Sequence, residues 1–342
     1  MQLRTLGATG VKVSPLCLGA MMLGPMGNPD QDACVRIIHR ALDAGVNFID
    51  TADIYSRGES ETIVGKAVKG RRDDLVVATK FFLPMGEDPN QRGGSRRWIV
   101  RAVEDSLRRL QVDHIDLYQM HRFDVDTDIE EVLFTLTELV RQGKIRTFGS
   151  SMFSSDRIVE AQWTAERRGL LRFRCEQPWY SIFVRDIERS ILPTCERYGM
   201  GVITWSPLDG GFLSGKYRGT EDLTPETRVA QFSQMLRGGF DPKEDFIQRK
   251  LALIPALEAI AQDEGLTLAQ LAVAFTLEHR AVTASIIGPR TLDQLEGLLP
   301  AGEARLSPEA LDRIDALVPP GTVLNPFADV PAATKAAIRR PR

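Results

Sequence analysis

Residues 48–55 read FIDTADIY, so an apolar start is followed at once by polar side chains. Phe48 and Ile49 are typical of a buried strand, whereas Asp50 and Tyr55 place a carboxylate and a phenol just beyond it. A strand that ends in this way either caps its own loop or takes part in chemistry. Chemistry would require partners from other strand ends.

Two other apolar stretches supply such partners. LVVATK, at 75–80, ends in Lys80, and IDLYQMH, at 115–121, ends in His121. Taken singly, Asp50 could be a loop cap, Tyr55 an interfacial ring, Lys80 a solvated strand end and His121 a structural histidine. If neighbouring strands bring all four to one rim, a catalytic group is the favoured interpretation.

The four residue types suit proton transfer to an oxygen that is becoming negative. A tyrosine with a pKa near 10 is a poor acid at neutral pH, and a neighbouring ammonium lowers that pKa by favouring the phenolate. We expect Lys80 to lower the pKa of Tyr55 by about two to three, with Asp50 holding Lys80 charged and His121 hydrogen-bonding a substrate oxygen. A carbonyl that accepts hydride is such a substrate.

Side chains cannot supply hydride, so this chemistry requires a nicotinamide or a flavin. A metal site is disfavoured, because His121 and Asp124 alone offer too few ligands.

A recurring unit of helix and strand must position these groups. Asp30 is a suitable N-cap, Gly45 suits the left-handed residue that ends a helix, and an apolar strand resumes at Phe48. The same order recurs from Asp128 through Gly143 to the apolar segment at 145–150.

Eight short strand segments alternate with helical sequence, which indicates parallel strands joined by helical crossovers. The sequence therefore predicts a closed (β/α)₈ barrel of the TIM type. A doubly wound open sheet is the alternative, but no GxGxxG follows the first strand. In such a barrel the active site lies at the carboxyl ends of the strands. The predicted strands are 16–19, 47–51, 75–80, 115–120, 145–150, 173–177, 201–205 and 284–288.

We predict one barrel domain over residues 1–342. Residues 3–13 resemble a small β-hairpin turning on Gly7 and Gly10, so 1–14 would be a hairpin cap. The barrel would occupy 15–306, with a long loop at 208–245 after its seventh strand. Residues 307–342 would form a C-terminal helix and a tail.

Composition narrows the classes of partner. The formal charge of −3 shows no basic excess, which argues against nucleic acid and anionic membrane surfaces as partners. No run of about 18 apolar residues and no signal peptide is present, so we expect a soluble, cytoplasmic protein. The four scattered cysteines predict buried free thiols.

The motifs GVNFIDTADIYSRGESETIVGKAV, LVVATK and VDHIDLYQMH resemble the aldo-keto reductase superfamily, and the likeness runs from the hairpin to the eighth strand. The resemblance implies a catalytic tetrad of Asp50, Tyr55, Lys80 and His121. It also implies that Tyr55 donates a proton while NADPH, extended across the barrel mouth, delivers hydride to a carbonyl.

The resemblance further assigns the NADPH/NADP⁺ contacts. Ser150 and Gln177 would hold the nicotinamide carboxamide, with Ser151 standing where many relatives have asparagine, and Tyr180 or its neighbours would stack on the ring. Gly297 and Leu298 replace Glu and Asn of many relatives near the adenine, which leaves the strictness of NADPH use open. The pyrophosphate loop would use Ser206, Leu208, Gly210, Leu213 and Lys216, and the adenosine end Gly288, Arg290 and Gln294.

The substrate pocket is expected to contain apolar and aromatic residues with one possible anion anchor: Met22, Phe81, Phe82, Arg122 and Phe123. The carbonyl could be an aldehyde, ketone, dicarbonyl or keto sugar, and the same chemistry could run as alcohol oxidation. The superfamily also contains potassium-channel β-subunits, so a regulatory nucleotide-binding module with little turnover is the alternative function. The oligomeric state stays open.

Overall fold

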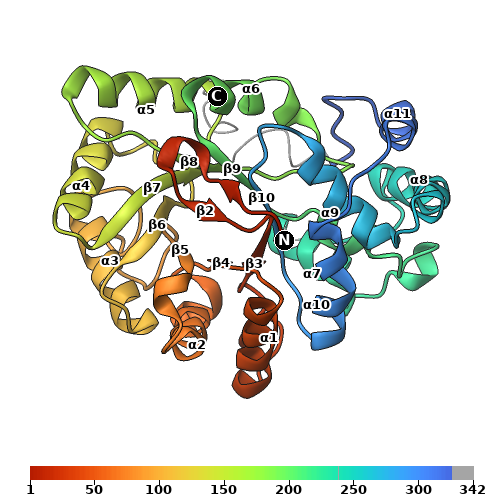
Figure 1. The fold of residues 1–342 in the computed structure, drawn as a ribbon, viewed down its shortest axis with the longest axis horizontal. Coiled ribbons are helices and arrows are strands. Elements are labelled where there is room, and N and C mark those ends of the chain that lie inside the picture. Colours follow the sequence, from red (N-terminus) through yellow and green to blue (C-terminus); the bar gives the residue numbers. More distant parts are fainter. Residues whose placement is uncertain (238, 326–342) are drawn as a thin grey trace.

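Eight parallel strands close into a barrel in the computed structural model, which describes residues 1–237 and 239–325 (Figure 1). The barrel order is β10, β3, β4, β5, β6, β7, β8 and β9, so each strand pairs with its neighbour in the chain and β10 closes the ring onto β3. The (β/α)₈ prediction is confirmed, and the open sheet is excluded. The barrel strands are β3 (Leu16–Gly19), β4 (Phe48–Asp50), β5 (Val76–Phe81), β6 (Ile115–Met120), β7 (Ile145–Ser151), β8 (Cys175–Gln177), β9 (Gly201–Thr204) and β10 (Ala284–Ile287).

Helices surround the strands, and α1 and α4 begin after the residues that the sequence signals predict. The side chain of Asp30 accepts a hydrogen bond from the Ala33 amide at the start of α1, and Gly45 has a φ of 88° beyond its end. Asp128 caps α4 through the Glu130 amide. The helices are α1 (Gln31–Asp43), α2 (Glu59–Val68), α3 (Arg96–Leu110), α4 (Ile129–Arg141), α5 (Ser155–Arg168), α6 (Ile191–Tyr198), α7 (Arg228–Arg237), α8 (Asp245–Asp263), α9 (Leu268–Glu278), α10 (Leu292–Leu298) and α11 (Pro308–Leu317).

A hairpin of β1 (Arg4–Thr5) and β2 (Lys12–Val13) closes the amino end of the barrel. It carries Leu6 and Val13 into a cluster of buried side chains contributed by the early residues of the barrel strands, among them Phe48 and Leu117. The hairpin crosses in front of the strands in Figure 1. Because this end is sealed by apolar contacts, the opposite, carboxyl end of the barrel is the one left for a site.

The segment after β9 is more ordered than the predicted long loop. It contains the 3₁₀ turns η5 (Asp209–Ser214) and η6 (Thr220–Asp222) and then helix α7. The sequence suggested a loop because glycine, threonine and aspartate are frequent there, yet Val229 and Phe232 bury one side of α7. Helix α11 falls within the predicted C-terminal extension, and the tail from 326 onward lies outside the described residues.

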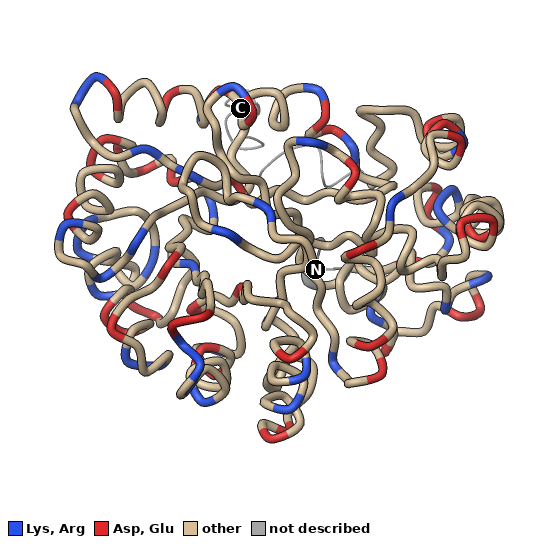
Figure 2. The backbone as a smooth tube through the Cα atoms, viewed as in Figure 1, with Lys and Arg blue, Asp and Glu red and all other residues tan. Residues whose placement is uncertain are grey.

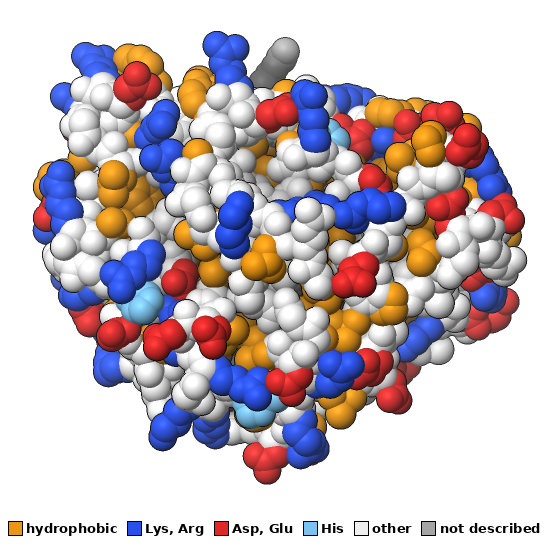
Figure 3. Space-filling view, in the orientation of Figure 1, with side chains coloured by type: hydrophobic (Ala, Val, Ile, Leu, Met, Phe, Trp, Pro, Cys, Tyr) orange, Lys and Arg blue, Asp and Glu red, His pale blue; other side chains and the backbone are white. Residues whose placement is uncertain are grey.

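Charged residues occur mainly on the outer helices and loops (Figure 2), and side chains of both signs are interspersed on the face shown in Figure 3. Within the described chain, no helix is both long enough and apolar enough to cross a bilayer. All four cysteines are buried free thiols, as predicted.

Candidate active site

At the carboxyl end of the barrel, several strands each direct a polar side chain toward the barrel axis. Phe48, Ala78, Leu117 and Cys175 lie in the buried interior cluster above the hairpin. Because side chains alternate with a period of two, the residues two positions later share that inward face. These residues are Asp50, Lys80, Gln119 and Gln177, and all four are buried.

A buried ion pair forms the centre of the site. The Lys80 Nζ lies 2.5 Å from Asp50 Oδ1, 2.8 Å from the Thr51 carbonyl oxygen and 3.3 Å from the Tyr55 hydroxyl. Burial acts to lower the pKa of Lys80, but the Asp50 carboxylate and the Tyr55 oxygen outweigh it, so the pKa lies above its ordinary value. Lys80 is therefore an ammonium at neutral pH, held in contact with Tyr55.

Two glutamines fix the other oxygen of Asp50. Gln119 Nε2 donates to Asp50 Oδ2 at 3.0 Å, and Gln177 Nε2 donates to the same atom at 2.9 Å. Gln177 also donates to Gln119 Oε1 at 3.2 Å. Gln119 was not identified from the sequence, although its position two residues after Leu117 could have indicated it. Both amides hold the carboxylate that holds Lys80.

His121 follows β6 and completes the group. Its ring meets the Tyr55 ring edge to face, with the centroids 6.0 Å apart. Burial, then the charges of Arg122 and Lys80, hold the pKa of His121 well below its usual 6.5, so the imidazole is neutral at neutral pH. Among the described residues its Nδ1 has no hydrogen-bond partner. The structure thus brings Asp50, Tyr55, Lys80 and His121 together at one rim.

The pKa of Tyr55 differs from the expectation. Burial raises it above its ordinary value of 10, and this effect exceeds the lowering by the nearby Lys80 ammonium. The sequence identified the cation but not the degree to which the phenol is enclosed. Tyr55 is therefore a protonated phenol at neutral pH, and Lys80 limits how far its pKa rises.

At the end of β7, Ser151 rather than Ser150 faces the barrel axis. Ser150 pairs in register with Met120 on the helix-facing side, and its hydroxyl donates to Glu176 Oε2 at 2.5 Å. Ser151 is the residue on the axis-facing side beside Gln177, whose carbonyl accepts its hydroxyl at 2.9 Å. The structure therefore does not bring Ser150 to the mouth. Ser151 lies in the position that was expected for Ser150.

Tyr180 also lies away from the mouth. Its ring packs on Phe275 of α9, and its hydroxyl donates to Glu188 Oε1 at 2.7 Å. Trp205 lies two residues after the axis-facing Ile203, and its ring stacks on Trp179 with centroids 4.9 Å apart. Trp205 is thus an aromatic side chain that follows the axis-facing positions of β9, and the sequence did not single it out.

The expected pyrophosphate loop follows β9 directly. Ser206 and Leu208 are partly exposed, Gly210 and Leu213 are buried, and Lys216 is exposed. The amides of Asp209, Gly210 and Gly211 already donate within the turn. Because these amides already donate to oxygens of the turn itself, the side chains of the loop are more available than its amides to donate to an anion.

Two guanidinium groups lie near each other at the expected adenosine end. Arg290 follows β10, its amide donating to Gln294 Oε1 at 2.8 Å, and exposed Gly288 lies two residues earlier. Burial and then the charge of Arg290 lower the pKa of Arg228 on α7. Neither arginine forms an ion pair with another described residue. Two cations without ion-pair partners among the described residues fit a phosphate dianion. Arg228 was not identified from the sequence, because a loop was expected where α7 lies.

Four of the five expected substrate-pocket residues follow strand ends at the mouth: Met22, Phe82, Arg122 and Phe123. Phe81 does not, because it faces the helices, is fully buried and stacks on Tyr118 with centroids 4.9 Å apart. Alternation after the axis-facing Lys80 requires this orientation.

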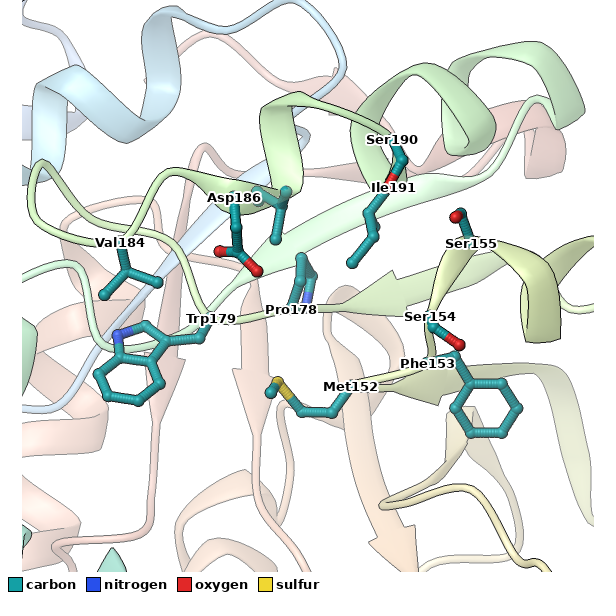
Figure 4. Close-up of a pocket in the computed structure, with 11 residues that line it drawn as sticks. Met152, Phe153, Ser154, Ser155, Pro178, Trp179, Val184, Asp186, Ser190 and Ile191 are labelled. Carbon is teal, nitrogen blue, oxygen red and sulfur yellow. The ribbon is translucent and has the colours of Figure 1, made fainter. Parts of the chain in front are cut away.

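A cavity of about 180 Å³ lies beside the carboxyl ends of β7 and β8 (Figure 4). Met152 and Pro178 lie between Trp179 on one side and the first residues of α5 on the other, with Ile191 above them. Met152 directly follows the axis-facing Ser151 and packs with Trp179 and Trp205. The cavity thus borders the aromatic cluster at the mouth.

Glu176 on β8 predicts a pH dependence of stability. Burial, opposed by the Ser150 hydroxyl and the Phe153 amide, raises its pKa from 4.5 to about 7. The folded protein therefore binds this proton more tightly than the unfolded chain, so stability should fall as pH rises from about 4.5 to about 7. The difference corresponds to about 3 kcal/mol. Urea unfolding of the wild type and Glu176→Gln at pH 5 and pH 8 measures it, since only the wild type should lose this contribution. An equal pH dependence in both would contradict the assignment.

Sequence comparisons agree with this architecture. A family model described as the aldo/keto reductase family matches residues 15–319. An uncharacterized oxidoreductase of Bacillus subtilis, YrpG, is 38% identical over 321 residues, covering 90% of this chain and 93% of the relative. A probable voltage-gated potassium channel subunit beta of Arabidopsis thaliana is 35% identical over 301 residues, 86% of this chain and 89% of the relative.

A third relative, from Schizosaccharomyces pombe and provisionally named an aryl-alcohol dehydrogenase, is 32% identical over 334 residues, covering 89% of this chain and 92% of its own length. The family model spans both the strands that carry the tetrad and the segment after β9. This protein belongs to the aldo/keto reductase family.

Proposed function

We propose that the protein reduces the carbonyl group of a small molecule with NADPH, and that Tyr55 donates the proton. Family membership and the relative named an oxidoreductase support an oxidoreductase. The observation that carries this proposal is the arrangement of Tyr55: its hydroxyl lies 3.3 Å from the buried Lys80 ammonium, and its ring meets the neutral His121 ring edge to face.

Each member of the tetrad then has a distinct task. His121 is neutral, and its Nδ1 is unpartnered among the described residues, so it can hydrogen-bond a substrate oxygen without adding charge. Tyr55 donates its proton to that oxygen as negative charge develops there. The Lys80 ammonium stabilises the phenolate that remains, and Asp50 keeps Lys80 charged and in place.

The described residues fit a nicotinamide dinucleotide phosphate. When bound, NADPH supplies hydride, which no side chain can provide. Ser151 and Gln177 would hold the carboxamide, Trp205 would stack on the ring, and Ser206 would contact the pyrophosphate. Arg228 and Arg290 would take the 2′-phosphate, because they are neighbouring cations without carboxylate partners in the described part of the chain.

An aromatic carbonyl compound is the substrate class that the cavity near β7 and β8 favours. Its volume of about 180 Å³ exceeds that of an engineered cavity of about 150 Å³ that holds benzene. Met152, Pro178, Trp179 and Ile191 give its lining an apolar part that suits a ring, beside the polar side chains of Ser154, Ser155, Asp186 and Ser190. A relative named an aryl-alcohol dehydrogenase is consistent with this choice.

Purified protein tests the function directly. We expect it to oxidise NADPH in the presence of 4-nitrobenzaldehyde or a small dicarbonyl, and to bind NADPH at least about tenfold more tightly than NADH, because only NADPH carries a dianion for Arg228 and Arg290. Absorbance at 340 nm follows turnover, and quenching of tryptophan fluorescence follows binding.

A regulatory module of the channel β-subunit kind is the second candidate, supported by the 35% identity to a protein of that name. Tight NADPH binding without turnover of any carbonyl tested would favour it. Absence of NADPH binding would contradict both candidates.

A further inference from the structure

A lysine is buried under the turn that follows β9. Lys250 of α8 has only 1% of its side chain exposed, and its Nζ lies 2.5 Å from Asp209 Oδ2. Phenylalanine rings enclose the ammonium, with centroids 4.8 Å away at Phe212, 5.4 Å at Phe246 and 5.9 Å at Phe183. A charge enclosed in this way depends on its carboxylate partner, because the loss of one partner leaves the other ion buried and uncompensated.

Asp209 has a constrained backbone conformation in its turn. Its φ is 49°, in the left-handed region that side chains other than glycine rarely adopt, and Gly210 and Gly211 follow with φ values of 68° and 113°. Such a conformation persists only where its surroundings hold it. The Asp209 side chain is tethered by its ion pair to Lys250.

The hydrogen bonds of this turn determine whether the Ser206 hydroxyl can donate a hydrogen bond to a ligand. The Asp209 amide donates to the Ser206 carbonyl at 2.9 Å, and the Gly210 amide donates to Ser206 Oγ at 3.0 Å. Because the hydroxyl oxygen of Ser206 accepts this bond, its proton is left for another acceptor, and none occurs among the described residues. The turn thus presents Ser206 as a donor.

We propose that the buried ion pair of Lys250 with Asp209 positions the turn at 206–211 so that the Ser206 hydroxyl donates to the phosphate chain of NADPH. The inference rests on the proposed function and extends it to a residue on α8. Lys250 is a positioning residue and does not contact the phosphates, because its Nζ is enclosed by Asp209 and the three rings.

The test combines Lys250→Met with Ser206→Ala and measures the NADPH dissociation constant by fluorescence titration. Methionine preserves the apolar stem and removes the ammonium. We expect Lys250→Met and Ser206→Ala each to weaken NADPH binding by about 10- to 100-fold, the loss of one hydrogen bond to a charged group. The double variant should bind about as weakly as Ser206→Ala alone, because Lys250 acts through Ser206.

Lys144→Met is the matched control, since Lys144 pairs with Glu104 away from the barrel mouth. It should leave the NADPH dissociation constant unchanged. At saturating NADPH, kcat of Lys250→Met should equal that of the wild type, because the tetrad is untouched. If Lys250→Met fails to fold, Asp209→Asn/Lys250→Met removes both charges, leaves no unpaired buried ion, and should show the same loss of affinity.

The outcomes separate this inference from the function on which it rests. Wild-type protein that does not bind NADPH would overturn the proposed function itself. If the wild type binds NADPH and Lys250→Met has the same dissociation constant, the inference is overturned. The ion pair would then have a purely structural role, even if the variant unfolds at a lower midpoint. The inference would also be overturned if the double variant lost NADPH affinity by the product of the two single losses. Lys250 would then act independently of Ser206.

Discussion

Replacing Tyr55 with phenylalanine is expected to lower turnover by about 10² to 10⁴ and to leave NADPH affinity nearly unchanged. The substitution removes only the hydroxyl, which lies 3.3 Å from the Lys80 ammonium on a ring that meets His121 edge to face. The remaining ring keeps its edge-to-face packing on His121. Single-turnover measurements with NADPH and 4-nitrobenzaldehyde would separate the chemical step from binding and product release.

Stability should change little in Tyr55→Phe, because its hydroxyl makes one long hydrogen bond, worth about 1 kcal/mol. Tyr198→Phe, at the last residue of α6, is the matched control and should keep wild-type turnover. If Tyr55→Phe also kept wild-type turnover, the proton would come from another group, and the proposed role of Tyr55 would be wrong.

The sequence predicted the tetrad because its members interrupt apolar strands at their carboxyl ends. Asp50 and Lys80 follow Phe48 and Ala78 by two residues, and the structure places all four on the inward face of the barrel. The closed parallel barrel was predictable from the same alternation of strand and helix. Capping residues such as Asp30 fixed helix boundaries well because their signal is local.

Features that depend on one residue of register or on enclosure were not predictable. Ser150 and Ser151 are chemically alike, and only the pairing with β6 and β8 shows which one faces the axis. The direction in which the pKa of Tyr55 shifts depends on burial that no local pattern encodes. Glu176 and Lys250 stand in ordinary mixed sequence, yet both are fully enclosed, because neighbouring segments distant in the chain cover them.

Replacing Lys80 with methionine is expected to have the largest effect on stability, and to abolish most turnover as well. The change leaves Asp50 buried with two glutamine donors but no cation, and losing one partner of a buried ion pair costs about 3 to 5 kcal/mol. It also removes the charge that opposes the burial-induced rise in the pKa of Tyr55, so the phenol becomes a weaker acid. Urea unfolding at pH 7 and the rate of carbonyl reduction measure the two effects.

Asp50→Asn combined with Lys80→Met separates these effects, because it removes both charges at once. The asparagine oxygen can still accept from Gln119 and Gln177, so the double variant should recover a large part of the lost stability. Turnover should stay low in the double variant, because no ammonium lies beside Tyr55. A double variant less stable than Lys80→Met alone would mean that the unpaired carboxylate is not the source of the instability. Recovery of turnover along with stability would mean that Lys80 supports the fold of the rim rather than the acidity of Tyr55.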